Sequence, residues 1–415
     1  MPRRVAICLS ALLVTSGALS AWILSKGERE PALRSAQATT EPKPASAAVS
    51  WPTYGRDGAR THAAPFSIRP PYRRVWSVYG DSSFIEFPPV MEAGRLYFGT
   101  DRGRVVAVDT DDGSLVWERF LGHCIAASPA ASGPTVFVAG MGTGPCGRGR
   151  GVLVALDAST GDVRWRFSAG PIESSPLVVG RLVVVGSHDG RIYALDTRDG
   201  HVRWWFTTRA AVKGSAAIAH GRVYIGSYDG NVYALNARTG RLRWVGRASG
   251  RGRFYATPTV AHGLVLIGAT NGTVYAFGER TGAVRWARSL GSFVYSSAAV
   301  AAGHVYVGSY DHRLYALKAT TGETAWSYEA RGPVSGAPTV VAGVVYFSSC
   351  GSCSRYESNP SARRTYGLDA RTGRLVWEFA DGEYSPVVTD GGRLYVTGHT
   401  TVYALVPARN GRPGG

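Results

Sequence analysis

Two cysteines have the spacing that redox or metal chemistry uses. Cys350 and Cys353 form a Cys-x-x-Cys pair in "SSCGSCSRYESNPSARR" (348–364), a spacing found in thiol redox, haem and zinc sites. Ser354 follows the pair where haem attachment requires His, and neither a second Cys pair nor a nearby His completes a zinc set. We therefore predict a structural disulfide between Cys350 and Cys353.

A second set of chemically capable residues recurs at one position, three residues before a proline or its equivalent in each repeat. The set is mixed in charge and consists of Glu86, Ala126, Glu173, Lys213, Tyr255, Tyr295, Ser335 and Glu383. Gathered in one place, these side chains would suit a small anionic or polar ligand; the alternative is a solvated channel. No Ser-His-Asp or paired-carboxylate set can be assigned. We expect His188, His312 and His399 on surface loops.

The positions recur because the chain repeats itself. An element like "VYALD" occurs eight times and ends at Asp109, Asp157, Asp196, Asn236, Gly278, Lys318, Asp369 and Val406. A tryptophan follows the first seven of these elements, with spacings of 48, 39, 40, 42, 40 and 51 residues. Periods of about 40–45 residues are typical of β-propeller blades.

Each unit has the pattern of four antiparallel strands. In residues 173–206 the apolar runs are short, alternate with period two and end in Gly turns. The last unit stops after a third strand, while "YRRVWSVYG", with Trp76, precedes the first complete unit. We therefore predict an all-β, eight-bladed propeller in which three C-terminal strands and one N-terminal strand close the ring.

The recurrent tryptophans are expected to be rigid apolar wedges between neighbouring blades. Loss of one such buried side chain costs about 3–5 kcal/mol. Stacking on a flat cofactor is the alternative role for an indole. The predicted blade tryptophans are Trp76, Trp117, Trp165, Trp204, Trp244, Trp286, Trp326 and Trp377.

The repeat "VYALDxxTGxxxW" resembles the tryptophan-docking repeat of the pyrroloquinoline-quinone-type propeller superfamily over roughly residues 76–406. The segment "SWPTYGRDGARTHAAP" (50–65) is similar to the N-terminal stretch of its quinoprotein dehydrogenases. The superfamily also includes non-catalytic scaffolds, exemplified by the lipoprotein of the outer-membrane β-barrel assembly machine. The resemblance therefore implies the fold and leaves two functional branches open.

In the dehydrogenase branch, the resemblance implies a quinone held between a Trp and, in many members, a disulfide of adjacent cysteines. It also implies calcium bound by Glu, Asn and Asp, with an Asp as base. This chain has no adjacent cysteine pair and no Cys-x-x-Cys-His, and we can assign no calcium trio. We expect a non-catalytic scaffold without a cofactor. The alternative is a dehydrogenase of alcohols or sugars that uses pyrroloquinoline quinone with calcium.

The N-terminus has the features of an export signal. Arg3 and Arg4 precede an uncharged run from Val5 to Leu24, and twenty helical residues reach about 30 Å, the hydrocarbon thickness. We predict a hydrophobic helix at residues 1–25 that anchors an extracytoplasmic propeller. A cleaved signal peptide, with Ala18 and Ser20 near the cleavage site, and a secreted product is the alternative.

The remaining boundaries follow from composition. Residues 26–50 are expected to form a disordered tether and 51–75 a lead-in segment; the propeller spans 76–407, and 408–415 form a flexible tail.

Two insertions after a second strand, 140–151 and 348–364, should lie at the end of the ring where the first strands begin. Cys124 and Cys146 would meet there, and a disulfide that closes about 22 residues stabilises by roughly 3 kcal/mol. Both disulfides fit an oxidising compartment. On this face we expect Arg148, Arg150, Arg363 and Arg364 to offer charge to an acidic partner. The alternative is that the loops only cap the channel.

The formal net charge of +17 would suit nucleic acid, anionic lipid or an acidic polymer. Export argues against nucleic acid, and the excess of Arg over Lys is also explained by genomic composition. We expect a monomer that contacts the membrane through its N-terminal helix and binds a protein or another cell-envelope partner.

Overall fold

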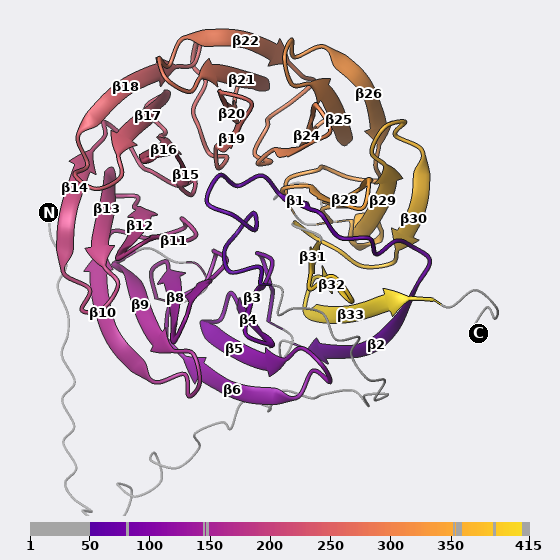
Figure 1. Cartoon of the computed structure of the whole chain (residues 1–415), viewed down its shortest axis with the longest axis horizontal. Coiled ribbons are helices and arrows are strands. Elements are labelled where there is room, and N and C mark those ends of the chain that lie inside the picture. Colours follow the sequence, from indigo (N-terminus) through magenta and orange to yellow (C-terminus); the bar gives the residue numbers. More distant parts are fainter. Residues whose placement is uncertain are drawn as a thin grey trace, which may run out of the picture. The chain divides into compact units, whose positions relative to one another are not determined.

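Eight β-sheets of one design surround a central channel (Figure 1). The computed structural model describes residues 50–79, 83–143, 146, 149–351, 353, 359–384 and 387–408, which belong to one compact unit of the chain. One 3₁₀ turn, Pro360–Ala362, accompanies the strands in this part of the chain. The predicted all-β, eight-bladed propeller is therefore confirmed.

In each blade, four strands run from the channel to the rim (Figure 1). Blades 1 to 4 consist of β3 (Val90–Glu92), β4 (Arg95–Gly99), β5 (Arg104–Asp109), β6 (Leu115–Phe120); β7 (Ala130–Ser132), β8 (Thr135–Gly140), β9 (Gly151–Asp157), β10 (Val163–Ala169); β11 (Leu177–Val179), β12 (Leu182–Gly186), β13 (Arg191–Asp196), β14 (Val202–Thr207); β15 (Ala217–Ala219), β16 (Arg222–Gly226), β17 (Asn231–Asn236) and β18 (Leu242–Arg247).

Blades 5 to 8 consist of β19 (Thr259–Ala261), β20 (Leu264–Gly268), β21 (Thr273–Gly278), β22 (Val284–Ser289); β23 (Ala299–Ala301), β24 (His304–Gly308), β25 (Arg313–Lys318), β26 (Thr324–Glu329); β27 (Thr339–Val341), β28 (Val344–Ser349), β29 (Arg364–Asp369), β30 (Leu375–Phe379); β31 (Val387–Thr389), β32 (Leu394–Thr397), β33 (Thr401–Pro407) and β2 (Tyr72–Tyr79). A short β1 (Ala63–Ala64) lies parallel to β27 in blade 7.

Burial differs between the middle and outer strands because blades pack face to face. The middle strands β12 and β13 are almost wholly buried, whereas the outer strand β14 alternates between exposed and buried positions. A strand covered on both faces needs a continuous apolar run, and a rim strand needs one on its inner face alone. The "LVVVG" and "RIYALD" segments therefore become middle strands.

In seven blades a β-bulge aims the tryptophan at the next blade; no such indole hydrogen bond is found for Trp377 among the described residues. Between β13 and β14 the register passes from Ala194↔Trp204 to Leu195↔Val202, which leaves the residue before the tryptophan unpaired. The indole then donates from Nε1 to a turn carbonyl of the next blade, as Trp204 does to Ala237 O at 3.1 Å. The equivalent bonds come from Trp76, Trp117, Trp165, Trp244, Trp286 and Trp326.

Each docked indole lies against a turn glycine. A Cβ built on Gly240, whose φ is +67°, would lie 2.6 Å from Cε3 of Trp204. The same approach recurs at Gly113, Gly161, Gly200, Gly282, Gly322 and Gly373. The Thr-Gly and Asp-Gly turns thus serve the blade interface as well as the hairpin.

The lead-in segment forms a strap along the inner strands, defined here as residues 51–64 (Figure 1). Its carbonyls accept backbone N–H bonds from Met91, Ala131, Ile218, Val260, Val300 and Val340, one inner strand after another. Arg60 is fully buried within the strap and donates to Tyr54 O, and its Nε donates to Ala216 O at 2.9 Å. The strap therefore ties six blades together from inside the channel.

The last blade joins the two ends of the described chain. β2 pairs antiparallel with β33, from Tyr72↔Pro407 to Tyr79↔Thr401. No helix in the described residues is long and apolar enough to cross a membrane. The predicted helix at 1–25 and nearly all of the predicted tether and tail lie outside the described residues.

The docking of tryptophan on glycine can be tested with two matched substitutions. Gly240→Ala and Gly221→Ala both place a side chain at φ near +70°, which costs about 1–3 kcal/mol. A Cβ at Gly221 meets nothing within 4 Å, whereas one at Gly240 meets Trp204. We expect Gly240→Ala to lower the free energy of unfolding by about 1–3 kcal/mol more than Gly221→Ala. Equal losses in chemical denaturation would show that the indole contact carries no weight.

Candidate functional site

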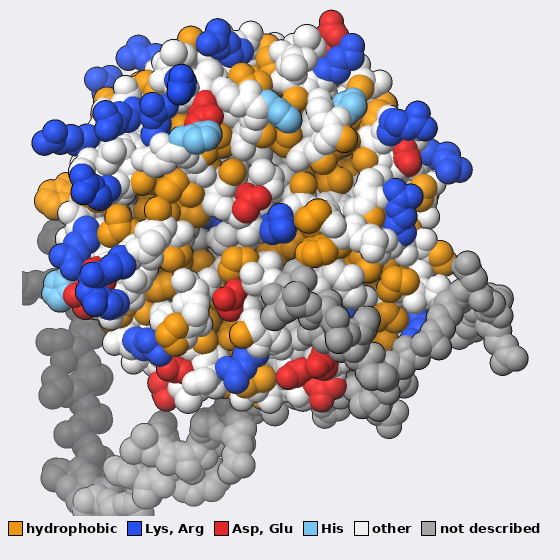
Figure 2. All heavy atoms as spheres, in the orientation of Figure 1, with side chains coloured by type: hydrophobic (Ala, Val, Ile, Leu, Met, Phe, Trp, Pro, Cys, Tyr) orange, Lys and Arg blue, Asp and Glu red, His pale blue; other side chains and the backbone are white. Residues whose placement is uncertain are grey.

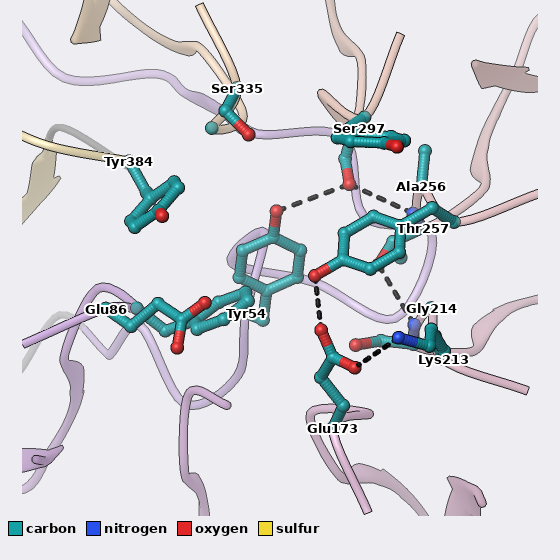
Figure 3. Close-up of a pocket in the computed structure, with 15 residues that line it drawn as sticks. Tyr54, Glu86, Glu173, Lys213, Gly214, Ala256, Thr257, Ser297, Ser335 and Tyr384 are labelled. Atoms are coloured by element: carbon teal, nitrogen blue, oxygen red, sulfur yellow. Dashed lines mark hydrogen bonds and ion pairs between the residues drawn. The ribbon is translucent and has the colours of Figure 1, made fainter. Parts of the chain in front are cut away.

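A pocket lies in the channel where the loops that precede the inner strands converge (Figure 3). It encloses about 500 Å³ of space, part of it open to solvent. Five blades contribute Glu86, Glu173, Lys213, Tyr255 and Tyr295, and the strap contributes Tyr54. We call this end of the ring the mouth.

Glu173 is the centre of a saturated network. Its Oε2 lies 2.9 Å from His188 Nε2 and 3.4 Å from Lys213 Nζ. Its Oε1 accepts a short hydrogen bond from the Tyr255 hydroxyl (Figure 3). Burial would raise the pKa of Glu173, but the His188 bond, Lys213 and Tyr255 outweigh it, and the pKa is lowered. Glu173 is thus held as a carboxylate with both oxygens engaged.

Glu86 lies across the pocket from this network (Figure 3). No side chain of the described residues donates a hydrogen bond or forms an ion pair with its carboxyl group. Burial, and then the charges of Glu173 and Asp101, raise the pKa of Glu86 to about 8, against the opposing effect of Lys213. Near neutral pH this carboxyl group is therefore largely protonated.

Aromatic rings form much of the wall. Lys213 Nζ lies 5.2 Å from the centroid of Tyr228 and 5.8 Å from that of Tyr255. The rings of Tyr255 and Tyr295 are 4.9 Å apart, and Tyr310 follows 5.0 Å beyond Tyr295. Burial, and then the charge of Glu173, raise the pKa of Tyr255 well above its ordinary value, so the hydroxyl stays a donor. The wall is flat, apolar in its ring faces and polar at its hydroxyls.

Six of the eight aligned positions line this pocket, and blades 2 and 8 differ. The six are Glu86, Glu173, Lys213, Tyr255, Tyr295 and Ser335. Ala126 is 2% exposed and does not line the pocket. In blade 8 the neighbouring Tyr384 lines it in place of Glu383. Glu383 occupies the same position before β31 as Glu173 does before β11, but its side chain does not line the pocket.

Glu383 instead lies beneath the Cys350–Cys353 disulfide. Its side chain is 1% exposed, with Oε1 2.9 Å from Cys350 Sγ and Oε2 3.0 Å from Arg363 Nε. His399 Nδ1 approaches Oε2 at 3.4 Å. The sulfur atoms and this carboxylate lie within 4.8 Å of one another, but the sulfurs are bonded to each other and are not thiolate ligands. The cluster is a buried ion pair under a loop.

The expected arginine patch is largely engaged within the protein. Arg363 pairs with Glu383, and Arg364 Nε lies 3.1 Å from Glu378 Oε1, with the two arginine side chains 22% and 24% exposed. Both were expected to offer charge to a partner, which this pairing opposes. Arg150 is exposed, and Arg148 lies outside the described residues.

Both predicted disulfides are present. Cys124 is joined to Cys146 across 22 residues, and Cys350 is joined to Cys353. The first ties the loop after β8 to the segment before β7. Both pairs fit an oxidising compartment.

Three residues of the site were not assigned to it in the sequence analysis: Tyr54 and Tyr384, which line the pocket, and His188, which contacts Glu173. Tyr54 belongs to the lead-in, which carries no repeat signal, and its hydroxyl donates to Ser297 Oγ at 3.3 Å (Figure 3). Tyr384 follows the aligned position, Glu383, by one residue, so the repeat alignment did not select it. His188 was expected on the surface, but it is the residue in blade 3 that departs from the "SYD" turn of blades 4 and 6, and that departure was a usable signal.

The opposite face of the ring carries the turns between strands within each blade. Basic side chains stand around its rim, with hydrophobic side chains further in (Figure 2). Here Arg393 Nη1 contacts Asp111 Oδ1 at 3.0 Å, and Arg119 pairs with Asp162. These ion pairs link neighbouring blades.

Comparison with known proteins places the chain. A family model described as outer membrane protein assembly factor BamB matches residues 72–144, 121–293 and 270–412. The chain belongs to this family. BamB from Yersinia pestis is 28% identical over 165 residues, which are 35% of this chain and 40% of that protein.

Two further likenesses show how widely the fold is used. The dehydrogenase subunit of a quinone alcohol dehydrogenase from Komagataeibacter europaeus is 37% identical over 89 residues, 19% of this chain and 12% of that protein. The crystal structure of BamB from Moraxella catarrhalis has a TM-score of 0.66 at 20% identity and covers 81% of this chain and 100% of that one. The matches span less than half the length of both curated relatives named here.

The raised pKa of Glu86 predicts a pH-dependent stability. The native state keeps this proton up to about pH 8, whereas the unfolded chain releases it near the ordinary pKa of 4.5. The contribution of Glu86 is therefore fully present below pH 4.5 and lost as pH rises through 8. We expect Glu86→Gln to gain free energy of unfolding relative to the native sequence between pH 5 and 8.5. A difference that stays constant across this range in urea denaturation would contradict the shift.

Proposed function

We propose that this protein is an extracytoplasmic, membrane-tethered, non-catalytic propeller that binds a partner or ligand at its mouth. The observation that carries the proposal is the saturation of Glu173, whose oxygens are taken by His188, Lys213 and Tyr255. Because both oxygens already have partners within the protein, the carboxylate suits a role in shaping the binding surface better than that of a general base. The family's description as an assembly factor supports the same role.

The alternative is a quinone-dependent dehydrogenase, which the likeness to the Komagataeibacter europaeus enzyme supports. The residues of the mouth do not fit that cofactor. Calcium takes six to eight oxygen ligands, and beside the engaged Glu173 the pocket offers Glu86 as its other carboxyl group. Lys213, the cation among the described lining residues, is already paired with Glu173, and no tryptophan lines the pocket there.

The mouth also offers apolar contact for a partner. Phe293 is 49% exposed and stacks on Tyr295 at 5.8 Å with an interplanar angle of 7°. Exposed aromatic rings held by a rigid scaffold are typical of the central residues of interfaces. We propose that a cell-envelope protein contacts this stack of Phe293 and Tyr295.

Site-specific crosslinking tests the choice of face. A photoreactive residue at Phe293 should join the protein to a partner in its native membrane, whereas one at Arg280, an exposed residue in the turn between β21 and β22 on the opposite face, should not. Mass spectrometry of the two products identifies the partner. Equal yields from the two positions, or products from Arg280 alone, would remove the mouth as the binding face.

Cofactor addition tests the enzymatic alternative. We expect the purified full chain, mixed with pyrroloquinoline quinone and calcium, to develop no protein-bound quinone absorption and no dye-linked oxidation of alcohols or sugars. The physical reason is that Lys213, the cation among the described residues that line the pocket, is already paired with Glu173 and so is not available to the quinone. A bound-cofactor band together with dye reduction above a cofactor-only control would establish the dehydrogenase instead.

A further inference from the structure

The two carboxyl groups of the mouth have matching surroundings but different partners. Glu173 has an ammonium group, that of Lys213, and this ammonium lies over the rings of Tyr228 and Tyr255. The protein thus already holds one primary ammonium between a carboxylate and aromatic faces. This arrangement combines ionic pairing with cation–π attraction.

Glu86 has the carboxyl group and the aromatic rings of such a site without the ammonium. Tyr384, Phe87 and Tyr54 line the pocket with it, and Phe84 lies 5.7 Å from Tyr384. Figure 3 shows Glu86 and Tyr384 on one side of the open space and Glu173 with Lys213 on the other. Among the described residues, no Lys, Arg or His forms an ion pair or a hydrogen bond with the Glu86 carboxyl group.

We propose that the mouth binds the primary ammonium group of a ligand at Glu86, between the carboxylate and the surrounding tyrosines. The inference rests on the proposed function, since it names the chemistry that the mouth recognises. A primary ammonium fits better than a quaternary one because it donates hydrogen bonds, which Glu86 and the hydroxyls of Ser335 and Tyr384 can accept. A divalent metal fits poorly because calcium takes six to eight oxygen ligands, whereas Glu86 and Glu173 are the carboxyl groups among the described residues that line the pocket.

The electrostatics of the mouth support a cation. The charged groups that act on Glu86 are Glu173 and Asp101, which raise its pKa, and Lys213, which lowers it. The nearby phenols of Tyr255, Tyr310 and Tyr384 have raised pKa values, chiefly through burial, so they stay neutral. A cation would replace the proton on Glu86 and relieve its repulsion with Glu173.

This exchange fixes the sign of the pH dependence. Glu86 must lose its proton when the ammonium binds, so binding releases a proton below pH 8. The affinity should rise about tenfold per pH unit well below pH 8 and level off above it, because alkylamines stay protonated to about pH 10. Release of a proton is measurable as a buffer-dependent heat.

Calorimetry on the full chain tests the proposal with 1,4-diaminobutane as the probe. We expect saturable binding with proton release, and no binding of 1,4-butanediol, which lacks the charge. Tetramethylammonium and calcium should bind at least tenfold more weakly. Tighter binding of either would overturn the primary-ammonium assignment.

Two variants locate the site. Glu86→Gln should lose at least tenfold in affinity and lose the proton release, while Glu92→Gln should change neither. Glu92 is a matched control because burial also raises its pKa, yet it lines a separate pocket beside the strap. Unchanged binding in Glu86→Gln, with the variant's fold verified by its unfolding transition, would place the amine elsewhere and overturn the proposal.

Parallel titrations distinguish two sources of the amine: a lysine of a protein partner and a small molecule. A lysine-containing peptide and its acetyl-lysine counterpart are titrated beside 1,4-diaminobutane. Preference for the peptide indicates a lysine of a protein partner, and preference for the diamine indicates a small molecule. Failure of both probes while crosslinks from Phe293 persist would refute the ammonium site and leave the scaffold standing. Binding of the diamine without any crosslink from Phe293 would support the ammonium site and refute the mouth as the face that contacts a protein partner.

Discussion

The seating of one blade's indole on the next blade's glycine turn is the contact on which the ring depends. A β-bulge pushes the tryptophan out of its strand, and the glycine turn leaves room for the ring edge. The hydrogen bond from the indole Nε1 to a turn carbonyl then fixes how far the ring inserts into the next blade, as between Trp204 and Ala237 O. Because each contact sets the angle between two blades, seven repetitions of it set the curvature of the described ring. Substitution in one turn would therefore act on a whole interface.

The strap solves a second problem, that of the inner strands. These strands are three residues long and expose N–H groups to the channel, where unpaired backbone donors are costly. The strap carbonyls accept hydrogen bonds from six of these strands. In return, Arg60 donates to Tyr54 O within the strap and to Ala216 O, just before β15. Burial lowers the pKa of His62 to about 3, so this strap residue stays neutral in the core. The strap also provides Tyr54, and so turns an open channel into a pocket with a floor.

Repetition explains what could be predicted from the sequence and what could not. The blades, the docking tryptophans and the glycine turns each occur seven or eight times, so one correct unit predicts the others. The Cys124–Cys146 disulfide followed from knowing which loops meet at one end of the ring, and the Cys350–Cys353 disulfide from its local spacing. Tyr54 could not be found in this way, because its position depends on hydrogen bonds between the strap and six separate blades. Glu383 was misplaced because its carboxylate contacts Arg363 and Cys350 instead of lining the pocket, and only the fold brings those residues to it.

Charge was harder still to predict, because pairing depends on neighbours distant in sequence. Arg363 looks like a free cation in a long loop, and only the fold brings Glu383 under it. Glu173 and Lys213 belong to adjacent blades, and Tyr255, which shares their network, belongs to the blade after that of Lys213. The fold therefore fixes where the mouth positions lie, but it does not determine which residues occupy them. In such a scaffold chemical function is decided by a handful of side chains, and here they form one completed ammonium pair and one carboxyl group that lacks its counterpart.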